Sequence, residues 1–361
     1  MRILILANND IGLYKFRKEL IVELLNQKHE IYISLPDGEF VRQLESMGCK
    51  FIDTFIDRRG INPFVDIKLL KRYRLMMKEI NPDLVITYTI KPNIYGGLSA
   101  RMANVRYVVN ITGLGTAFQK NGLIKTIVIT MYKVALRKVK VVFFENSSNR
   151  DEFIKYNICP REKMCVLNGA GVNTEEFSYI QYPHNDVFRF LFIGRVMKEK
   201  GVEELFLATK KLIEKNLKVK LDVVGPCEEN YEKVLKQYEQ EGWLIYHNYQ
   251  EDVRPFIELC DCFILPSWHE GMANTNLECA SSGRPIITSN IPGCREAVID
   301  GKTGFLCESM NNDSVYSVMH KIIKLTWEQR KNMGIEGRKY MKNTFEKRNV
   351  INQTIFALEI K

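Results

Sequence analysis

The sequence predicts an α/β protein of two consecutive doubly wound domains, each a parallel sheet covered by helices on both faces. Short apolar runs alternate with segments of helical period through the first half, and the alternation restarts after residue 186. Strands separated by helices of this length are typical of parallel sheets. The length of 361 residues also exceeds what one hydrophobic core usually organises, so two domains are expected.

The expected elements follow this alternation along the chain. In the first half, strands are expected at 3–7, 30–34, 51–52, 84–87, 107–110 and 141–144, and helices near 16–26, 40–47, 67–80, 95–102 and 124–136. In the second half, strands are expected at 188–193, 219–224, 244–246, 262–265, 285–288 and 304–306. Helices are expected there at 201–215, 229–238, 253–259, 274–280, 314–325, 328–343 and 348–360.

The segment 178–186 is polar, rich in turn residues and without either period, so it predicts a domain boundary. The expected domains are 1–178 and 179–345, with a C-terminal helix at 346–361 that packs back on the first domain. Two doubly wound units place a ligand site at the carboxyl ends of their strands, facing the cleft between the domains.

The bulk composition is that of a soluble globular protein, with 45% hydrophobic and 26% charged residues. The apolar start at 1–7 is too short for a signal peptide and is expected to form a strand. No apolar run reaches the length of a membrane-spanning helix. The nine cysteines are odd in number and form no CxxC pair, which predicts reduced thiols in a cytoplasmic protein and no zinc site.

The net charge of +9 is concentrated in the first half of the chain. Residues 1–178 carry 27 Lys+Arg against 18 Asp+Glu, whereas the remainder carries 25 of each. The excess is densest over 101–140, which has eight basic residues and no acidic one. This surface is either simply solvated, or it attracts an anionic partner such as a phosphorylated substrate or an anionic membrane. No nucleic acid is expected, because no helix-turn-helix, zinc-finger or RNP-like pattern is present.

The most informative segment, 266–283, follows an apolar strand and opens a helix. Gly271 allows a tight turn and a close approach of the backbone to a ligand. The next four residues place their amides at a helix N-terminus, where free N–H groups and the helix dipole favour a diphosphate. These residues are Met272, Ala273, Asn274 and Thr275.

Two carboxylates flank this turn. Glu270 precedes the helix, and Glu278 lies about one turn inside it. Carboxylate oxygens accept hydrogen bonds, so both suit the recognition of sugar or ribose hydroxyls. Taken alone, however, the two residues are more simply explained as a surface carboxylate and a charge near a helix N-terminus.

The motifs taken together resemble the signature of family 4 retaining glycosyltransferases, over essentially the whole chain. The matching segments are EGMANTNLE (270–278), LPS (265–267), GRPII (283–287), GCREAVIDGKTG (293–304), FIGR (192–195), KEKG (198–201), DVVG (222–225) and DV (252–253). The resemblance implies two Rossmann-like domains facing a cleft, the arrangement called GT-B.

The resemblance also implies roles for the donor-side residues. Arg195 and Lys200 would hold the donor diphosphate, Glu270 the sugar hydroxyls and Glu278 the ribose. Arg195, Lys200 and Glu270 are the catalytic candidates, because stabilising the leaving nucleoside diphosphate is the main catalytic task. Two cations and a helix N-terminus supply the positive potential, and no DxD triad is present, so neither a metal nor another cofactor is expected.

The first half is expected to bind the acceptor. Gly12, in the loop after the first strand, is expected to approach the donor phosphates. The segments 16–17, 89–97 and 110–115 resemble the subgroup that builds capsular and other surface polysaccharides on a polyprenyl-diphosphate lipid. The acceptor-binding candidates are Arg17, Lys91, Asn93 and Thr112.

The roles of these candidates stay open at several points. Lys91 suits a phosphate contact. Asn93 suits a hydroxyl contact and equally a helix cap after Pro92. Many relatives carry a histidine near the transferred sugar in the first domain, and none of the five histidines here falls there. Thr112 or Asn110 is the candidate replacement.

The basic segment 120–140 predicts a helix with apolar sides and a cationic side. It either rests on an anionic membrane surface or packs as an ordinary core-facing helix. If the segment rests on a membrane, the protein is expected in the cytoplasm, peripheral on the inner face of the cytoplasmic membrane.

The leading prediction is a retaining, metal-independent hexosyltransferase. It would move a hexose or N-acetylhexosamine from a UDP-sugar of galactose, GalNAc or GlcNAc type to a polyprenyl-diphosphate-linked glycan or oligosaccharide. The alternatives are a sugar-nucleotide epimerase on the same fold and a non-catalytic, membrane-associated nucleotide-sugar binding protein. Nicotinamide-dependent redox chemistry is disfavoured, because residues 8–12 offer a single glycine where a GxGxxG turn should stand.

Overall fold

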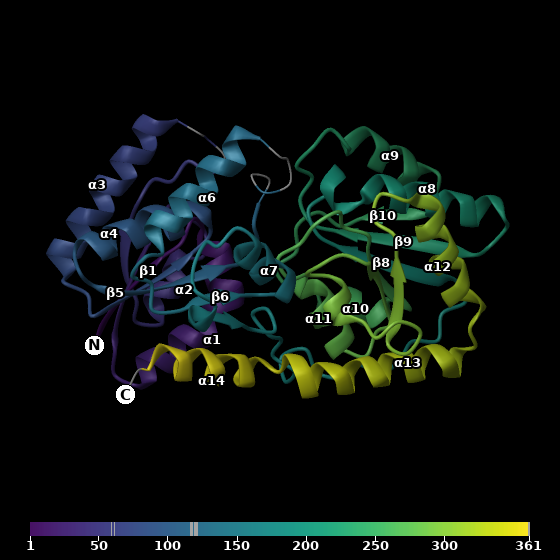
Figure 1. The fold of residues 1–361 in the computed structure, drawn as a ribbon. Helices are drawn as coiled ribbons and strands as arrows, with labels where there is room; N and C mark the ends of the chain where they lie inside the picture. The colour runs from purple at the N-terminus through teal and green to yellow at the C-terminus, as the bar shows by residue number, and fades with distance from the viewer. Residues whose placement is uncertain (59, 61, 116–117, 119–121, 360–361) are drawn as a thin grey trace. The chain divides into compact units, whose positions relative to one another are not determined.

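The chain forms two compact units, each built on one parallel sheet (Figure 1). The computed structural model describes residues 1–58, 60, 62–115, 118 and 122–359. The first unit comprises Met1–Ala170 together with Val350–Lys361, and the second comprises Gly171–Asn349.

Within the described residues, the first sheet has seven strands in the order β3-β2-β1-β4-β5-β6-β7. The strands are β1 (Arg2–Leu6), β2 (Glu30–Leu35), β3 (Lys50–Asp53), β4 (Leu84–Tyr88), β5 (Arg106–Ile111), β6 (Val142–Phe144) and β7 (Met164–Val166). The helices are α1 (Asp10–Asn26), α2 (Val41–Ser46), α3 (Pro63–Ile80), α4 (Gly97–Met102), α6 (Leu123–Ala135) and α7 (Ser147–Lys155), with a π-helical turn at Pro92–Gly96. All the pairings are parallel.

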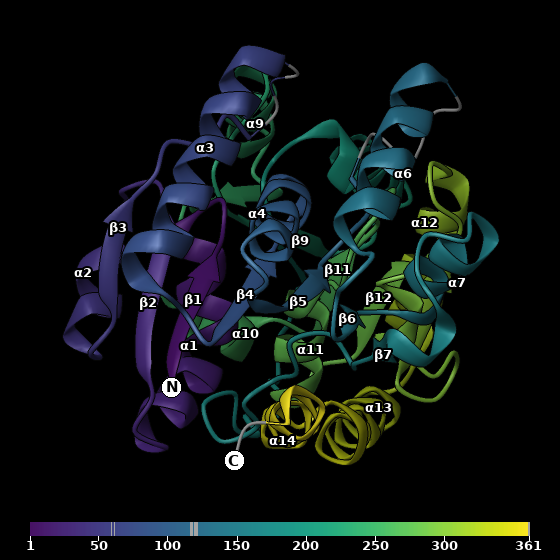
Figure 2. The ribbon, with the colours of Figure 1, turned by 60° about the vertical axis from the view of Figure 1, so that its left-hand side comes forward.

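Alternate side chains of β1 enter two separate cores, because neighbouring residues of a strand point to opposite faces. Ile3 and Ile5 pack against α1, α2 and the C-terminal helix α14 (Lys347–Leu358). Leu4 and Leu6 belong to the core under α3, α4, α6 and α7 (Figure 2). The first sheet is therefore covered on both faces, as a doubly wound sheet requires.

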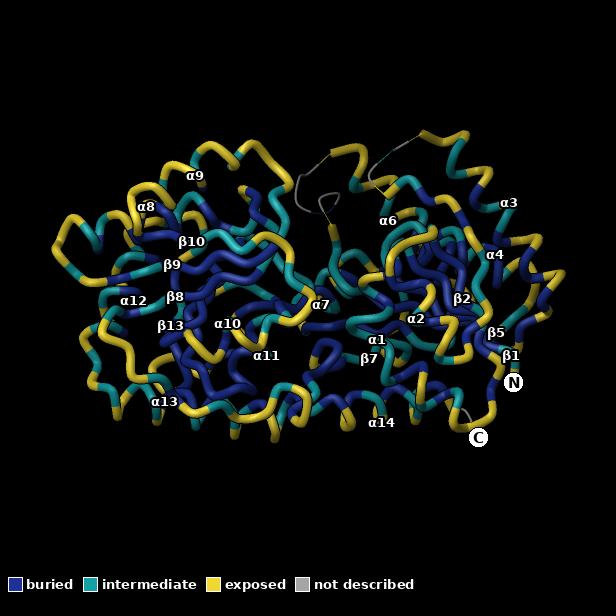
Figure 3. Tube along the Cα trace, turned by 180° about the vertical axis from the view of Figure 1, so that it is seen from behind, coloured by how far each residue is buried: buried dark blue, intermediate teal, exposed yellow. Residues whose placement is uncertain are grey.

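The second sheet repeats the plan, with six parallel strands among the described residues in the order β10-β9-β8-β11-β12-β13. The strands are β8 (Phe188–Ile193), β9 (Val219–Val224), β10 (Leu244–Tyr246), β11 (Cys262–Leu265), β12 (Ile286–Ser289) and β13 (Gly304–Cys307). The helices are α8 (Val202–Glu214), α9 (Glu232–Gln240), α10 (Arg254–Leu259), α11 (Asn274–Ser281), α12 (Asn312–Lys324) and α13 (Trp327–Tyr340). In both units the strands are mostly buried, and the exposed residues lie mainly on helices and loops (Figure 3).

The predicted fold class is confirmed, and most strands lie within one or two residues of their predicted positions. Three local differences stand out. Helix α1 begins at Asp10 and not near residue 16, because the Asn9 side chain caps it by accepting from the Gly12 amide. Strand β7 and helix α7 were not predicted, since both are short and only weakly periodic.

The first unit ends at Ala170, ahead of the boundary predicted at 178. Residues just after it join the second unit through backbone hydrogen bonds: the Val172 amide donates to Phe345, and the Lys347 amide donates to Val172. From Val350 onward α14 belongs to the first unit, where the Arg106 guanidinium donates to the Leu358 carbonyl at 3.0 Å. Residues 360–361 of the predicted C-terminal helix lie outside the described residues.

Candidate functional site

The carboxyl ends of β8 and β11 bring together two loops of the second unit. The loop after β8 carries Arg195 and Lys200, and the loop after β11 carries Glu270 and leads into α11. Because β8 and β11 are parallel neighbours, both loops leave the same edge of the sheet. Ligands of doubly wound sheets bind at this edge.

Gly201 sets how closely the two loops approach. Its φ is +72°, and a Cβ at this position would lie 2.0 Å from the Pro266 carbonyl oxygen. Only glycine fits such an approach without moving the backbone. The Trp268 amide also donates to the Glu199 carbonyl at 3.0 Å. The two loops are thus joined backbone to backbone beside Lys200.

Lys200 and Glu270 form the centre of the site. The Lys200 ammonium lies 2.5 Å from Glu270 Oε1, and the same oxygen accepts from the Ser267 hydroxyl at 2.8 Å. The two charged side chains are only 18% and 13% exposed. Such a pair is screened less by water than a surface pair, so it holds both groups in a defined position.

A third loop supports Glu270 from behind. At Gly293 φ is +84°, and an added Cβ would lie 2.6 Å from the Glu270 carbonyl oxygen and 2.7 Å from that of Gly271. The Gly293 carbonyl accepts from the Ala273 amide at 2.7 Å. The glycine predicted from the 293–304 motif therefore packs directly against the turn that carries Glu270.

The amides predicted to hold a diphosphate at the start of α11 are not all available. The Ala273 amide already donates to the Gly293 carbonyl, so in this structure it is not free to donate to a diphosphate. Met272 contributes a buried side chain to the core. No side chain of the described residues caps α11, and the amides of Asn274 and Thr275 stand in its first turn. First-turn amides have no partner inside the helix, so these two remain suitable donors.

The other two predicted donor residues flank this centre. The Arg195 guanidinium pairs with Glu228 at 2.8 Å, and both side chains are more than one-third exposed, at 42% and 35%. Glu278 lies on α11 and is half-buried. Arg195 is thus a partly solvent-facing cation, in contrast to the enclosed Lys200.

In the first unit, the predicted role of Gly12 is not supported. Gly12 lies in the first turn of α1 and its amide donates to Asn9 at 2.6 Å, so it is not part of an open loop. Arg17, farther along α1, forms an ion pair with Glu145, and its guanidinium lies 5.1 Å from the centre of the Tyr88 ring. Burial raises the pKa of Glu145, although Arg17 opposes this shift.

The remaining acceptor candidates differ in how far they are available. Lys91 pairs with Asp66 at 2.6 Å and is largely buried. Asn93 does not cap a helix, and its side chain is already bonded within the first unit. It is buried, accepts from the Thr87 hydroxyl at 2.8 Å and donates to the Asn110 carbonyl at 2.9 Å. Thr112 is half-buried directly after β5.

Sequence reasoning missed Glu145 and Asp66, the partners of two predicted cations. Glu145 is 128 residues from Arg17 in the chain, and Asp66 is 25 residues from Lys91. No motif joins these positions, and only the folded sheet and helices bring them together.

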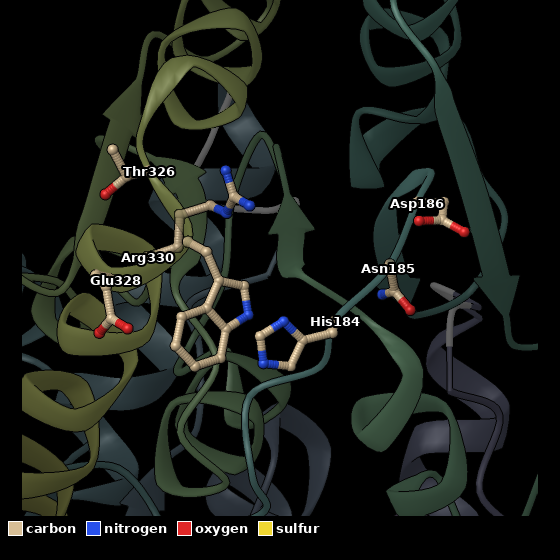
Figure 4. A pocket seen from close by; sticks show the side chains of 7 residues that line it. His184, Asn185, Asp186, Thr326, Glu328 and Arg330 are labelled. Atoms are coloured by element: carbon tan, nitrogen blue, oxygen red, sulfur yellow. The ribbon is translucent and has the colours of Figure 1, made fainter.

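A shallow pocket of about 480 Å³ lies elsewhere in the second unit (Figure 4). Its lining residues precede β8 or begin α13, and the His184 ring stacks on Trp327 at 4.1 Å. It contains none of the predicted site residues. Within the described ranges, no three His, Cys, Asp or Glu side chains gather as a metal site.

Comparison with known proteins identifies the chain's relatives. A family model for "Glycosyl transferase 4-like" proteins matches residues 2–146, and one for "Glycosyl transferases group 1" matches 175–340. The chain is 26% identical to an N,N'-diacetylbacillosaminyl-diphospho-undecaprenol alpha-1,3-N-acetylgalactosaminyltransferase of Campylobacter jejuni, covering 96% of this chain and 97% of that protein. It is 25% identical to the capsular polysaccharide biosynthesis glycosyltransferase CapM of Staphylococcus aureus, covering 90% and 88%.

Solved structures share the fold across the full length. A glycosyltransferase from Rickettsia africae matches with a TM-score of 0.80 at 18% identity, covering 100% of this chain and 99% of that one. Anabaena Alr3699/HepE, solved in complex with UDP and glucose, matches with a TM-score of 0.78 at 15% identity, covering 99% of each chain. The two family models and these folds confirm the predicted resemblance. The chain belongs to the glycosyltransferases that join a 4-like domain to a group 1 domain on the GT-B fold.

Proposed function

We propose that this glycosyltransferase moves a hexose or N-acetylhexosamine from a UDP-sugar to a glycan carried on a polyprenyl diphosphate, with retention at the anomeric carbon. The observation that supports a UDP-sugar donor is the enclosed Lys200–Glu270 pair beside the start of α11. The relatives support the acceptor, because their names include diphospho-undecaprenol acceptors. One of them, an Escherichia coli protein 28% identical over 77% of this chain, also has UDP-Gal in its name as donor.

On this proposal the donor diphosphate displaces two carboxylates from two cations. Lys200 leaves Glu270 and Arg195 leaves Glu228, and both cations then contact phosphate oxygens. Glu270, released from Lys200, accepts hydrogen bonds from the sugar hydroxyls. The amides of Asn274 and Thr275 add donors at the positive end of α11.

The same groups assist the bond change. The bond between the anomeric carbon and the UDP oxygen breaks, and a bond from that carbon to the acceptor oxygen forms. The acceptor hydroxyl gives its proton to the departing diphosphate oxygen, and UDP leaves with the electron pair of the broken bond. Negative charge grows on the leaving diphosphate, where Lys200 and Arg195 stabilise it. Glu278 is assigned to the ribose.

The direct test is UDP release from several UDP-sugars, with and without a polyprenyl-diphosphate-linked sugar. Release that requires both substrates, with a new disaccharide on the lipid, is the expected result. An epimerase would instead convert one UDP-sugar into its epimer without acceptor, and a binding protein would release no UDP. Arg195→Ala and Glu278→Ala should weaken donor binding or slow transfer with the fold intact, and full activity in both would remove the site assignment.

We further propose that the protein is cytoplasmic and rests on the inner face of the cytoplasmic membrane through the basic segment 120–140. No helix in the described part of the chain is long and apolar enough to cross a membrane. In α6, Ile129, Tyr132 and Ala135 face the core. Its other side exposes Lys133, followed by Arg137 and Lys138. Residues 120 and 121 lie outside the described part.

The first turns of α6 are also unusually apolar for an exposed surface. Leu123, Ile124 and Ile127 are 77%, 54% and 48% exposed. Lys125, predicted on the cationic side, instead lies against Glu152 and the Tyr156 ring. An apolar end next to a cationic face suits the interface of an anionic membrane.

Sedimentation with anionic liposomes tests this surface. Neutralising Lys133, Arg137 and Lys138 should reduce binding, and replacing Leu123 and Ile127 by Ser should reduce it further at high salt, where charge attraction is screened. A matched control neutralises three exposed lysines of the other unit, Lys218, Lys233 and Lys236. Equal loss in this control would show that only net charge matters.

A further inference from the structure

Thr89 has a strained backbone and an unsatisfied hydroxyl at the carboxyl end of β4. Its φ is +72°, and among the described non-glycine residues with positive φ it is the only β-branched one. β-branched side chains strongly disfavour this left-handed region. The Thr89 hydroxyl oxygen is buried and has no hydrogen-bond partner among the described residues.

The hydroxyl of Thr87, two residues before Thr89, has a hydrogen-bond partner. Thr87 is fully buried within β4, and its hydroxyl donates to Asn93 at 2.8 Å. Thr87 is therefore satisfied inside the sheet, as buried polar groups usually are. Stability alone does not account for Thr89, since valine has the same shape without the hydroxyl, and glycine or asparagine would relieve the strain.

A second unsatisfied group lies at the same edge of the first sheet. Asn149, in the first turn of α7 after β6, is buried, and its side-chain amide nitrogen has no partner among the described residues. Between β4 and β6 lies only β5. The Arg17–Glu145 pair lies at this edge too, with Arg17 over the ring of Tyr88, the residue before Thr89.

The charge of this group indicates the kind of ligand. Arg17 is neutralised by Glu145, and Lys91, just beyond Thr89, is neutralised by Asp66. The two groups without a partner among the described residues, the Thr89 hydroxyl and the Asn149 amide, are themselves uncharged. What remains is a hydroxyl, a primary amide and a paired guanidinium and carboxylate, a neutral set of donors and acceptors that matches sugar hydroxyls.

We infer that Thr89 and Asn149 bind hydroxyl groups of the acceptor sugar, with the Arg17–Glu145 pair holding the surrounding surface in place. This inference rests on the proposed function, because it assigns the acceptor of that reaction. The Thr89 oxygen is covered in this structure, so neighbouring side chains must turn aside as the sugar binds. Thr89 is then a specificity-determining residue. Its strained backbone conformation is kept because the hydroxyl contributes to binding of the acceptor sugar.

The test compares Thr89→Val with Thr87→Val, using N-acetylglucosaminyl diphosphate on a short polyprenol as acceptor. Thr89→Val should keep or raise the melting temperature, because an unsatisfied hydroxyl is removed, and should raise the acceptor KM about tenfold, as expected for one lost hydrogen bond. Its KM for the UDP-sugar should not change. Thr89→Ser should restore the acceptor KM.

Thr87→Val should show the opposite pattern, a lower melting temperature with an unchanged acceptor KM, because it leaves Asn93 without its donor. A wild-type acceptor KM in an active Thr89→Val enzyme overturns the inference and leaves the proposed function intact. If wild-type protein neither hydrolyses a UDP-sugar nor transfers its sugar, the proposed function is wrong, and the inference is withdrawn with it.

Discussion

Replacing Glu270 by Gln separates two effects that act in opposite directions on the donor. In the structure, Lys200 is held by Glu270 at 2.5 Å and is only 18% exposed. On the proposed assignment, the diphosphate of UDP takes Lys200 from a carboxylate and then lies close to the carboxylate left behind. Glutamine keeps the shape and the acceptor oxygen for Ser267 but removes the charge.

The magnitude follows from that contact. A hydrogen bond to a charged group contributes about 1.5–3 kcal/mol, and the lower end applies here because both side chains keep some access to water. About 1.5 kcal/mol corresponds to roughly tenfold in affinity. Glu270→Gln should thus bind free UDP about tenfold more tightly. Transfer from a UDP-sugar should fall about tenfold or more, because an acceptor for the sugar hydroxyls is weakened.

Calorimetric titration with UDP and steady-state transfer measure the two effects separately. Glu228→Gln is the matched control, since it frees Arg195 in the same way but touches no sugar hydroxyl on the proposed assignment. It should tighten UDP binding slightly and leave transfer almost unchanged. Weaker UDP binding by Glu270→Gln, or transfer at the wild-type rate, would refute the assigned roles.

Three further predictions concern the folding stability of the protein. Gly201→Ala should destabilise the protein by more than about 2 kcal/mol in urea unfolding, because strain adds to a backbone clash, whereas Gly242→Ala, with φ +82° and open space around it, should cost only about 1 kcal/mol. Arg284 is fully buried and donates to backbone carbonyls, so Arg284→Met should cost about 3 kcal/mol or more, and a loss no larger than that of the exposed control Arg295→Met would contradict this. Burial raises the pKa of Glu145 above its unfolded value of about 4.3, so the folded state holds the proton more tightly and loses stability as pH rises through the window between the two values. Glu145→Gln should lack this component of the pH dependence, and identical pH profiles of unfolding for the two proteins would show that the shift is absent.

The order of strands and helices was readable from the sequence because it depends on local patterns. The run Phe188–Ile193 and the helix after it are distinguished by period and apolar content alone. Errors occurred where a single side chain decides the outcome. Asn9 starts α1 six residues early by capping it, and α7 is too short and polar to show a period.

The grouping of the proposed donor residues at one sheet edge was predictable for a similar reason. Glu270, Asn274 and Glu278 lie within nine consecutive residues, so one turn and one helix place them all. Lys200 required a motif in a separate loop, and its approach to Glu270 depends on the glycine that follows it.

The sequence by itself therefore determined the two doubly wound sheets, the family and the edge of the second sheet where the proposed donor residues lie. Only the tertiary structure decided which cations are paired and which polar groups are left unsatisfied. Arg17 meets Glu145 across 128 residues, Asn93 is bonded within the sheet, and Thr89 has a strained backbone and no hydrogen-bond partner in the described part of the chain. The physical reason is that periodicity and capping act over a few residues, whereas pairing and burial depend on side chains that only the packed sheet brings together.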